Sequence, residues 1–147
     1  MASLSLKSLD RRVSAIEVAR KNGAQVQLAA AGKLKKGEID VGYTIHDGQP
    51  ARLILMPERA DRLTWDEAQA WAKKNDGELP SRIDALILFQ RARDKFETSE
   101  RPSYWTGEQY ANDPSCAWHQ WFYNGDHYHW NKVNKIRACL VRRVPIR

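Results

Sequence analysis

The spacing of apolar residues predicts a helix over residues 4–20, followed by a connector up to residue 50. Apolar side chains recur in this helix every three or four positions, as in a short coiled-coil seam. The seam residues are Leu6, Leu9, Val13 and Ile16. We expect this helix either to join copies of the chain, with a trimer as one form, or to pack against the rest of the protein. In the connector, residues 39–45 alternate as a strand does, and residues 46–48 predict a turn.

Two helices are predicted after a short apolar strand that Pro57 ends. Thr64 is the N-cap of the first helix, and Glu67 three residues later completes a capping box. Ser81 opens the second helix with the same spacing to Asp84, whose carboxylate we interpret as a helix-start residue favoured by the helix dipole. The apolar side of the second helix consists of Ile83, Leu86, Ile87 and Phe89.

Strands are predicted again from Tyr104 onward. Residues 117–123 alternate in polarity, so their side chains point to two opposite faces. One face carries Trp118, Gln120 and Phe122, and the other carries His119, Trp121 and Tyr123. The Asn-Gly pair at residues 124–125 predicts a hairpin turn, from which the chain returns as a second strand. Residues 136–144 are apolar enough to form the central strand of a sheet.

Aromatic residues are concentrated in this hairpin. Four of the six tryptophans and four of the five tyrosines lie between residues 104 and 130, interleaved with polar side chains. The tryptophans that we assign to the core are Trp65, Trp71, Trp105 and Trp118. The remaining rings are expected to form an exposed patch, and such patches usually mark an interface. Aromatic side chains lose little rotamer entropy on binding, which favours recognition over catalysis.

Five short motifs occur in the same order as in one known family. They are Trp65–Ala72, Leu79–Arg82, Tyr104–Gly107, Ala117–Gly125 and Leu140–Arg143. On these motifs the chain resembles the lectin-like domain of bacteria and phages that is named for the Lcl C-terminal domain. The resemblance covers residues 51–147 and implies an α+β, C-type-lectin-like fold with two helices packed on short antiparallel sheets. Residues 1–50 are then an N-terminal helical extension for attachment or oligomerisation.

The resemblance also implies a relationship to the variable proteins of diversity-generating retroelements and to phage receptor-binding tips. In those proteins, the outward residues of this hairpin and of the segment after it form the binding face. The matching residues, which are our predicted ligand-binding residues, are His119, Trp121, Tyr123, Asp126, His127, Tyr128, His129, Trp130 and Asn131. We therefore expect a phage- or prophage-encoded recognition module that binds a protein or a glycan. A variable receptor-binding protein is the most specific form of this expectation, and a bacterial surface is one expected location of the ligand. The alternative is an intracellular interaction or inhibitor protein of a mobile element that acts on a host complex.

Charge and cysteine content narrow the expected partners. The formal net charge is +6, but the cations are scattered and no nucleic-acid motif is present, so we do not expect nucleic acid as the partner. We interpret Cys116 and Cys139 as reduced thiols, although paired strands would also allow a bridge between them. No apolar run is long enough to insert into a bilayer. Charges interrupt the apolar region that a signal peptide needs, so we expect synthesis in the bacterial cytoplasm, with association with a virion as one outcome.

No catalytic motif is apparent, and we expect a protein without enzymatic activity and without a cofactor. His127 and His129 would share one face of a strand and could reach an ion together with His119. Zinc sites need three or four ligands, however, so we favour surface contacts over a metal site. Lys132 stands where calcium-dependent lectins need a carboxylate, which predicts calcium-independent binding.

Overall fold

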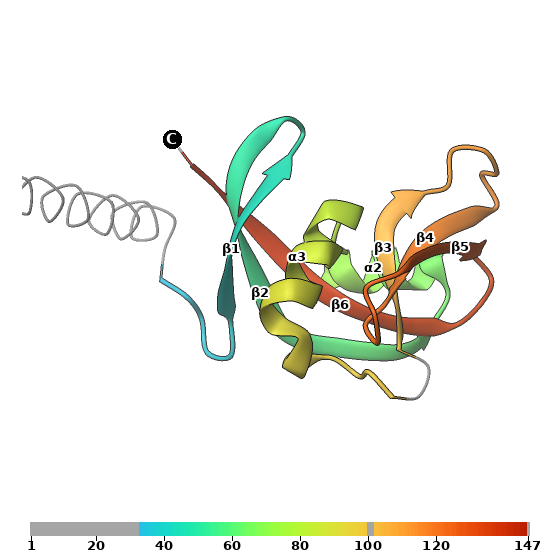
Figure 1. Ribbon diagram of the computed structural model, residues 1–147, viewed down its shortest axis with the longest axis horizontal. Helices are drawn as coiled ribbons and strands as arrows, with labels where there is room; N and C mark the ends of the chain where they lie inside the picture. The colour runs from blue at the N-terminus through green and yellow to red at the C-terminus, as the bar shows by residue number, and fades with distance from the viewer. Residues whose placement is uncertain (1–32, 100–101, 147) are drawn as a thin grey trace, which may run out of the picture. The chain divides into compact units, whose positions relative to one another are not determined.

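The computed structural model describes residues 33–99 and 102–146 (Figure 1). Its strands are β1 (Ile39–His46), β2 (Gln49–Leu63), β3 (Ser103–Gln109), β4 (Cys116–Trp121), β5 (His127–Asn131) and β6 (Ile136–Pro145). Its helices are α2 (Trp65–Lys74) and α3 (Arg82–Ala92), and the 3-10 turn η1 (Arg93–Lys95) follows α3. The fold class is α+β, as the sequence predicts. The predicted seam residues Leu6, Leu9, Val13 and Ile16 lie outside the described residues.

The six strands form one mixed sheet in the order β1-β2-β6-β3-β4-β5. Neighbouring strands are antiparallel except β3 and β6, which run parallel and pair at Tyr104 and Arg137. β1 and β5 are therefore the two edges of the sheet, and Figure 1 shows them at opposite ends of the folded unit. The predicted hairpin is the β4–β5 pair, so the outer edge of β5 has no neighbouring strand among the described residues.

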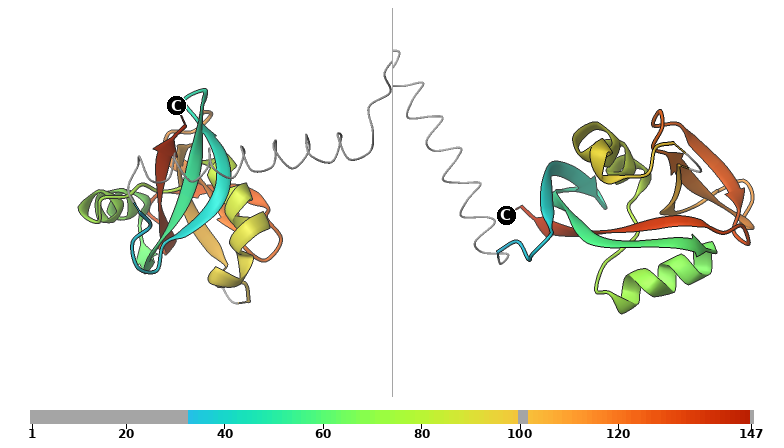
Figure 2. Two further views of the ribbon diagram at one scale, coloured as in Figure 1. Left: turned by 90° about the vertical axis from the view of Figure 1, so that its left-hand side faces the viewer. Right: turned by 90° about the horizontal axis from the view of Figure 1, so that it is seen from below.

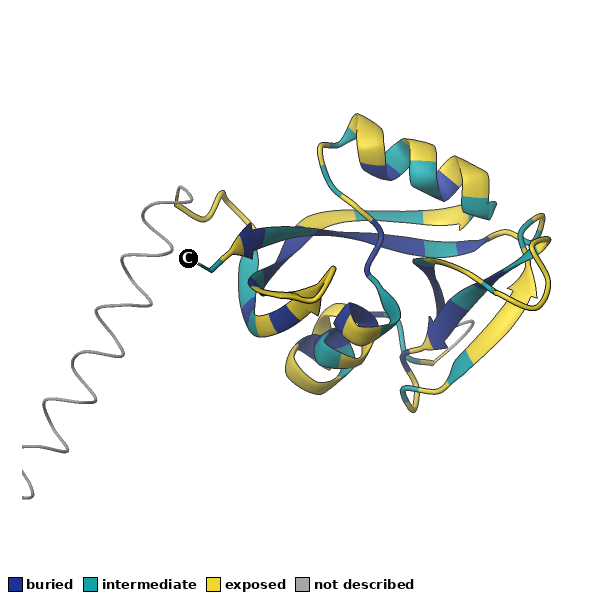
Figure 3. Cartoon of the chain, turned by 90° about the horizontal axis from the view of Figure 1, so that it is seen from above, coloured by how far each residue is buried: buried dark blue, intermediate teal, exposed yellow. Residues whose placement is uncertain are grey.

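β6 is the central strand that the sequence predicts, and it is buried on both faces. α2 covers one face and α3 the other, as Figures 2 and 3 show. Cys139 and Val141 belong to the hydrophobic core on the α3 side, whereas Ala138 and Leu140 belong to the core on the α2 side. Consecutive side chains of a strand point to opposite faces, so this one strand is a wall of both cores.

Both helices begin at the predicted capping boxes. The Thr64 hydroxyl accepts a hydrogen bond from the backbone N–H of Glu67 at 3.2 Å, and the Glu67 carboxylate accepts one from the backbone N–H of Thr64. Ser81 and Asp84 make the same reciprocal bonds at the start of α3. These bonds satisfy amide groups that the first turn of a helix leaves unpaired. The start of each helix is thus determined by its own local sequence.

The buried side of α3 differs from the predicted one. Ile87 and Phe89 pack against the core as predicted. Ile83 and Leu86, however, are 51% and 49% exposed and do not belong to the inward face. The buried residues of α3 are Asp84, Ala85, Leu88 and Ala92. The Asp84 carboxylate explains this orientation, because it is fully buried and accepts hydrogen bonds from Arg143 and from the Thr44 hydroxyl. Asp84 is therefore part of a buried ion pair as well as a helix-start residue.

β2 does not end at Pro57, which corrects the predicted strand boundary. The strand continues to Leu63, and its register with β6 shifts between Leu55 and Arg59. Pro57 lies in this bulge, beyond the last residue of β2 that pairs with β1. A proline ends a strand only where the neighbouring strand needs a backbone N–H from that residue. At this bulge no such hydrogen bond is required, so β2 continues past Pro57.

The folded unit extends from Leu34 to Ile146 and includes the hairpin before residue 51. β1 pairs with β2 across a two-residue turn, in which Asp47 and Gly48 both have positive φ. This is the geometry that tight hairpins favour. The predicted strand and turn are confirmed, but they belong to the same unit as the strands and helices that follow.

Candidate functional site: the aromatic hairpin

The predicted ligand-binding residues lie on two opposite faces of the β4–β5 hairpin. The strands pair antiparallel, with His119 opposite Tyr128 and Trp118 opposite His129. Because side chains alternate along a strand, neighbours in the sequence point away from each other. One face carries His119, Trp121, Tyr128 and Trp130, and the other carries Trp118, Gln120, His127, His129 and Asn131. The nine predicted residues therefore do not form one continuous surface.

The first face is an exposed group of aromatic rings. Trp121, Tyr128 and Trp130 are 38%, 41% and 46% exposed, and the ring centroids of Trp121 and Tyr128 are 4.9 Å apart. Tyr123, in the turn beyond β4, is 61% exposed. We call Trp121, Tyr123, Tyr128 and Trp130 the aromatic surface. Trp121, Tyr128 and Trp130 share one face of the hairpin, and Tyr123 adds a fourth exposed ring in its turn. Exposed apolar side chains on one element are typical of an interaction site.

A cavity of about 780 Å³ lies beside two of these rings. We call it the tryptophan pocket, and its lining residues are Asp61, Arg62, Pro102, Ser103, Trp121, Trp130, Lys135, Ile136 and Arg137. The hairpin supplies the aromatic wall, while β2, the start of β3 and the region around the start of β6 supply the remaining walls. The volume is within the range of small-ligand sites.

Three cations and one carboxylate line the tryptophan pocket. Arg62 has a φ of 58°, an unusual value for a residue with a side chain, at the irregularity in β2 between Ala60 and Leu63. The Asp61 carboxylate accepts a hydrogen bond from the backbone N–H of Arg62 at 2.7 Å. It also lies 3.5 Å from a guanidinium nitrogen of Arg137. The residue with this unusual backbone conformation is thus one of those that line the pocket.

His119 lies beneath the aromatic surface and not on it. Its side chain belongs to a residue only 4% exposed, packed edge-to-face against Trp105 with ring centroids 6.1 Å apart. The rings of Tyr128 and Trp130 lie 6.0 and 5.8 Å away. Burial lowers the pKa of His119 to about 4, and the neighbouring imidazoles of β5 act in the same direction. His119 therefore supports the exposed rings as a neutral imidazole, which differs from its predicted role as a contact residue.

The opposite face of the hairpin is occupied by contacts within the protein. The rings of Tyr110 and His129 are stacked, with centroids 3.9 Å apart and planes 4° from parallel. The guanidinium of Arg82 lies 3.6 Å from the ring centre of Trp118. These contacts attach the hairpin to the start of α3 and to the loop after β3. His129 therefore has a structural role, because its ring helps to hold the hairpin against the rest of the protein.

His127 is likewise held by neighbouring side chains. Its Nδ1 accepts a hydrogen bond from Nε of Arg82 at 3.1 Å, so its Nε2 carries the proton and donates to the Gln120 amide oxygen at 2.7 Å. The Gln120 amide nitrogen donates to the carbonyl of Ala85. Burial and the Arg82 charge lower the pKa of His127. Asn131 accepts a hydrogen bond within the turn after β5, so neither residue belongs to the aromatic surface.

Asp126 orders the turn of the hairpin. Its carboxylate accepts hydrogen bonds from the Asn124 amide at 2.9 Å and from the Tyr128 hydroxyl at 3.0 Å. The connection is longer than the predicted two-residue Asn-Gly turn, because Phe122 leaves the strand and packs in the core on the α3 side. Gly125 has a φ of 81°, which favours glycine. The turn is thus fixed by its own hydrogen bonds before any ligand binds.

The histidines do not converge on a common point, because His119 lies on the opposite face from His127 and His129. Within residues 33–99 and 102–146, no group of three or more metal-ligating side chains is close enough to hold an ion. Cys116 and Cys139 are both free, and β3 separates their strands. None of the helices in the described residues is both long and apolar enough to cross a membrane.

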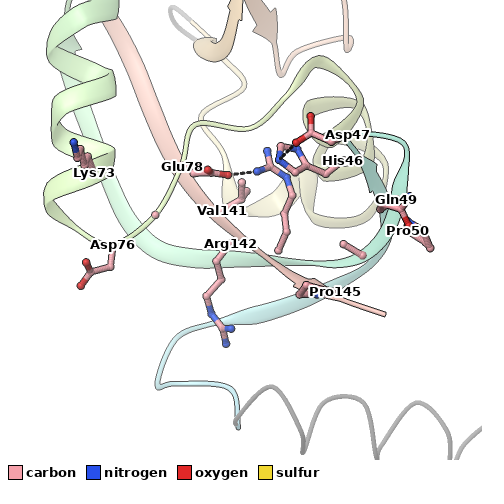
Figure 4. A pocket seen from close by; sticks show the side chains of 13 residues that line it. His46, Asp47, Gln49, Pro50, Lys73, Asp76, Glu78, Val141, Arg142 and Pro145 are labelled. Atoms are coloured by element: carbon pink, nitrogen blue, oxygen red, sulfur yellow. Dashed lines mark hydrogen bonds and ion pairs between the residues drawn. The ribbon is translucent and has the colours of Figure 1, made fainter. Parts of the chain in front are cut away.

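A second cavity, of about 710 Å³, lies near the β1–β2 turn at the other end of the sheet (Figure 4). Arg143 at this cavity pairs with Glu78 and with the buried carboxylate of Asp84. Arg142 pairs with Glu38 at 2.8 Å. The arginines of this cavity are therefore neutralised within the protein, in contrast to the tryptophan pocket.

Comparison of this chain with protein-family models and with curated proteins gives no match. The pocket cations were not among the residues predicted from the sequence. Arg62 comes from β2, which is distant in sequence from the hairpin, whereas Lys135 and Arg137 follow β5 closely along the chain. Only the folded sheet brings all three cations beside the two tryptophans, and no local pattern indicates it.

Proposed function

We propose that this protein is a recognition module of phage or prophage origin that binds a protein or a glycan through the aromatic surface and the tryptophan pocket. The observation that carries the proposal is the grouping of large exposed rings on an edge hairpin, beside a cavity of ligand size. Tyrosine and tryptophan supply a large contact area at low entropic cost, which is how binding loops gain affinity.

The proposal includes a C-type-lectin-like arrangement within the α+β class. Two features support it. β2 and β6 bring the ends of the predicted domain together, with Ala51 opposite Pro145. Two helices pack on the sheet, and the five motifs of the resemblance occur in the expected order. In the family that the chain resembles, the corresponding hairpin is the binding element.

The hairpin is also ordered in advance of binding. The Asp126 hydrogen bonds fix the turn, and Arg93 donates to the Tyr123 carbonyl at 2.6 Å. On the far side, the stacked Tyr110 and His129 rings hold β5 against the protein. A surface whose backbone is already fixed loses less conformational entropy when a partner covers it.

The test is a double substitution, Trp121→Ala with Trp130→Ala, in immobilised protein that is offered intact bacterial cells and, separately, cell lysate. Loss of cell capture with an unchanged circular dichroism spectrum and melting temperature is the expected result. If the wild type captures a partner from lysate but does not capture cells, and the variant loses that partner, the intracellular inhibitor is favoured instead. Unfolding of the variant would show that the two rings are structural.

A matched control separates the aromatic surface from exposed aromatic residues in general. Tyr43 on β1 is 60% exposed, close to the 61% of Tyr123, but it lies at the opposite edge of the sheet. Tyr43→Ala is expected to leave capture unchanged, whereas Tyr123→Ala together with Tyr128→Ala weakens it. Equal losses in both variants would contradict the assignment of the binding surface to the hairpin.

A further inference from the structure

We propose that the tryptophan pocket binds an acidic side chain of a partner protein, presented next to an apolar or aromatic side chain that packs on the aromatic surface. This inference rests on the proposed function, since it specifies the chemistry of the ligand at the same site. Its basis is that, among the described residues, three cations and one carboxylate line a cavity that two indole rings also line.

Among the described residues, two of the pocket cations form no close ion pair. The capping hydrogen bonds of α2 lower the pKa of the Glu67 carboxylate, and the Lys135 charge contributes to this at longer range. Within the part of the chain that the structure describes, neither the Arg62 nor the Lys135 side chain lies within 4.0 Å of a carboxylate oxygen. Arg137 has only Asp61, at 3.5 Å, which is longer than a well-formed charge-assisted hydrogen bond. The pocket therefore presents three cations against one carboxylate.

Three arginines elsewhere in the unit are paired more closely with carboxylates. Arg52 lies 2.7 Å from Asp40, and Arg142 lies 2.8 Å from Glu38. Arg143 is bound by two carboxylates at the cavity near the β1–β2 turn. The side chains of other described cations, such as Arg59 and Arg82, also lie beyond 4.0 Å from any described carboxylate oxygen. What distinguishes the tryptophan pocket is that its cations line a cavity of ligand size together with two indole rings, so that an arriving carboxylate finds donors beside an apolar wall.

The apolar walls determine what must accompany the carboxylate. Trp121, Trp130 and Ile136 line the pocket together with the cations. A ligand that fills this space places an anionic group against the cations and an apolar group against the indole rings. Adjacent acidic and aromatic or aliphatic residues of a polypeptide have this combination, and electrostatic complementarity of this kind selects partners and speeds association.

Charge placement favours a protein over a nucleic acid. A nucleic-acid strand needs cations repeated along its phosphate backbone. Here the cations line the tryptophan pocket, whereas the turn of the hairpin carries the Asp126 carboxylate, which accepts a hydrogen bond from the Tyr128 hydroxyl. That carboxylate repels a polyanion that runs across the hairpin. A sugar is also less well matched, since Ser103 is the one neutral side chain with a hydrogen-bond acceptor among the described residues that line the pocket, and the two indoles can only donate.

The experiment selects ligands for the full-length protein from a displayed library of short random peptides. Selected peptides are then synthesised in pairs, with each Glu or Asp replaced by Gln or Asn in the second member. Binding is measured by fluorescence anisotropy for the wild type, for Arg62→Glu, for Lys135→Glu and for the double variant Trp121→Ala with Trp130→Ala. The control is Arg91→Glu, which changes an exposed cation on α3. Oligothymidine and polygalacturonate serve as non-peptide anionic probes.

The expected result is enrichment of acidic residues next to aromatic or aliphatic ones. Affinity should fall by about ten-fold or more on removal of the peptide carboxylate or on reversal of either pocket cation, and stay unchanged in the Arg91 control. Affinity should also decrease with rising salt concentration.

Three outcomes overturn the inference, and they differ in what they mean for the proposed function. Neutral peptides whose binding requires Trp121 and Trp130 but not the cations would leave the proposed function intact. Charge-dependent binding of oligothymidine or polygalacturonate, without acidic peptides, would assign the pocket to another class of polyanion. Binding that is indifferent to the two tryptophans in every arm would remove the proposed function as well.

Discussion

Acidification should destabilise the fold through His119. The unfolded chain protonates this imidazole near the ordinary histidine pKa of 6.5, whereas the folded chain does so only near 4, because the ring is buried among Trp105, Tyr128 and Trp130. Between these two values the unfolded state binds more protons, so the free energy of unfolding falls as the pH falls through this window. At 1.36 kcal/mol per pKa unit, the loss amounts to about 3 kcal/mol. It is complete below the folded pKa, and the full stability is present above pH 6.5.

The assay is urea denaturation of wild type and of His119→Phe across pH 4 to 7.5. Phenylalanine keeps an aromatic ring at this position and removes the buried Nδ1, which has no hydrogen-bond partner in the described residues. Carboxylates titrate in both proteins, so the difference between the two pH profiles isolates the imidazole. We expect the variant to lose about 3 kcal/mol less than wild type as the pH drops. Parallel profiles would refute the assignment of a neutral, buried His119.

Three further substitution and labelling experiments test other parts of the structure. Gly125→Ala should lower the free energy of unfolding by about 1–3 kcal/mol, since φ is 81° and the new Cβ would lie 2.9 Å from the Phe89 ring. Denaturant titration measures this free energy, and an unchanged value would contradict the turn geometry. Arg143→Met should cost about 3–5 kcal/mol by leaving the buried Asp84 carboxylate without its guanidinium partner, and a loss under about 1 kcal/mol in the same titration would contradict a buried ion pair at this position. A thiol reagent at pH 8 should modify Cys116 in the folded protein but not Cys139, because burial raises the pKa of Cys139 to about 12. Mass spectrometry identifies the labelled residue, and prompt labelling of both thiols would contradict the burial of Cys139.

The elements that depend on local chemistry were predictable from the sequence. Thr64 with Glu67 marks one helix start and Ser81 with Asp84 the other, because a capping box is completed within four residues. The apolar run of β6 likewise indicates a strand covered on both faces. In these cases the interacting groups are neighbours in the chain, so their pattern is visible without a fold.

The predictions that were wrong concern residues whose surroundings are determined by groups far apart in the sequence. Asp84 turns inward because Arg143 binds it, and this leaves Ile83 and Leu86 exposed despite their apolar character. The predicted binding residues of the hairpin were treated as one surface, although strand alternation divides them. His119 has the same phase as Trp121 but is buried, because it lies over Trp105 rather than near the outer edge. Alternation indicates which face a residue occupies and not what covers that face.

The double burial of β6 has a consequence for how the unit loses its structure. The core under α2 and the core under α3 share this strand as a common wall, so neither can open while the other keeps all of its contacts. The two cores therefore melt in a single cooperative transition, and the amides of β6 exchange with solvent last. The exposed rings of the hairpin belong to neither core, although Tyr128 and Trp130 also cover His119. Replacements that keep His119 covered can therefore change this surface with little loss of folding stability, which is the condition under which a binding surface evolves freely.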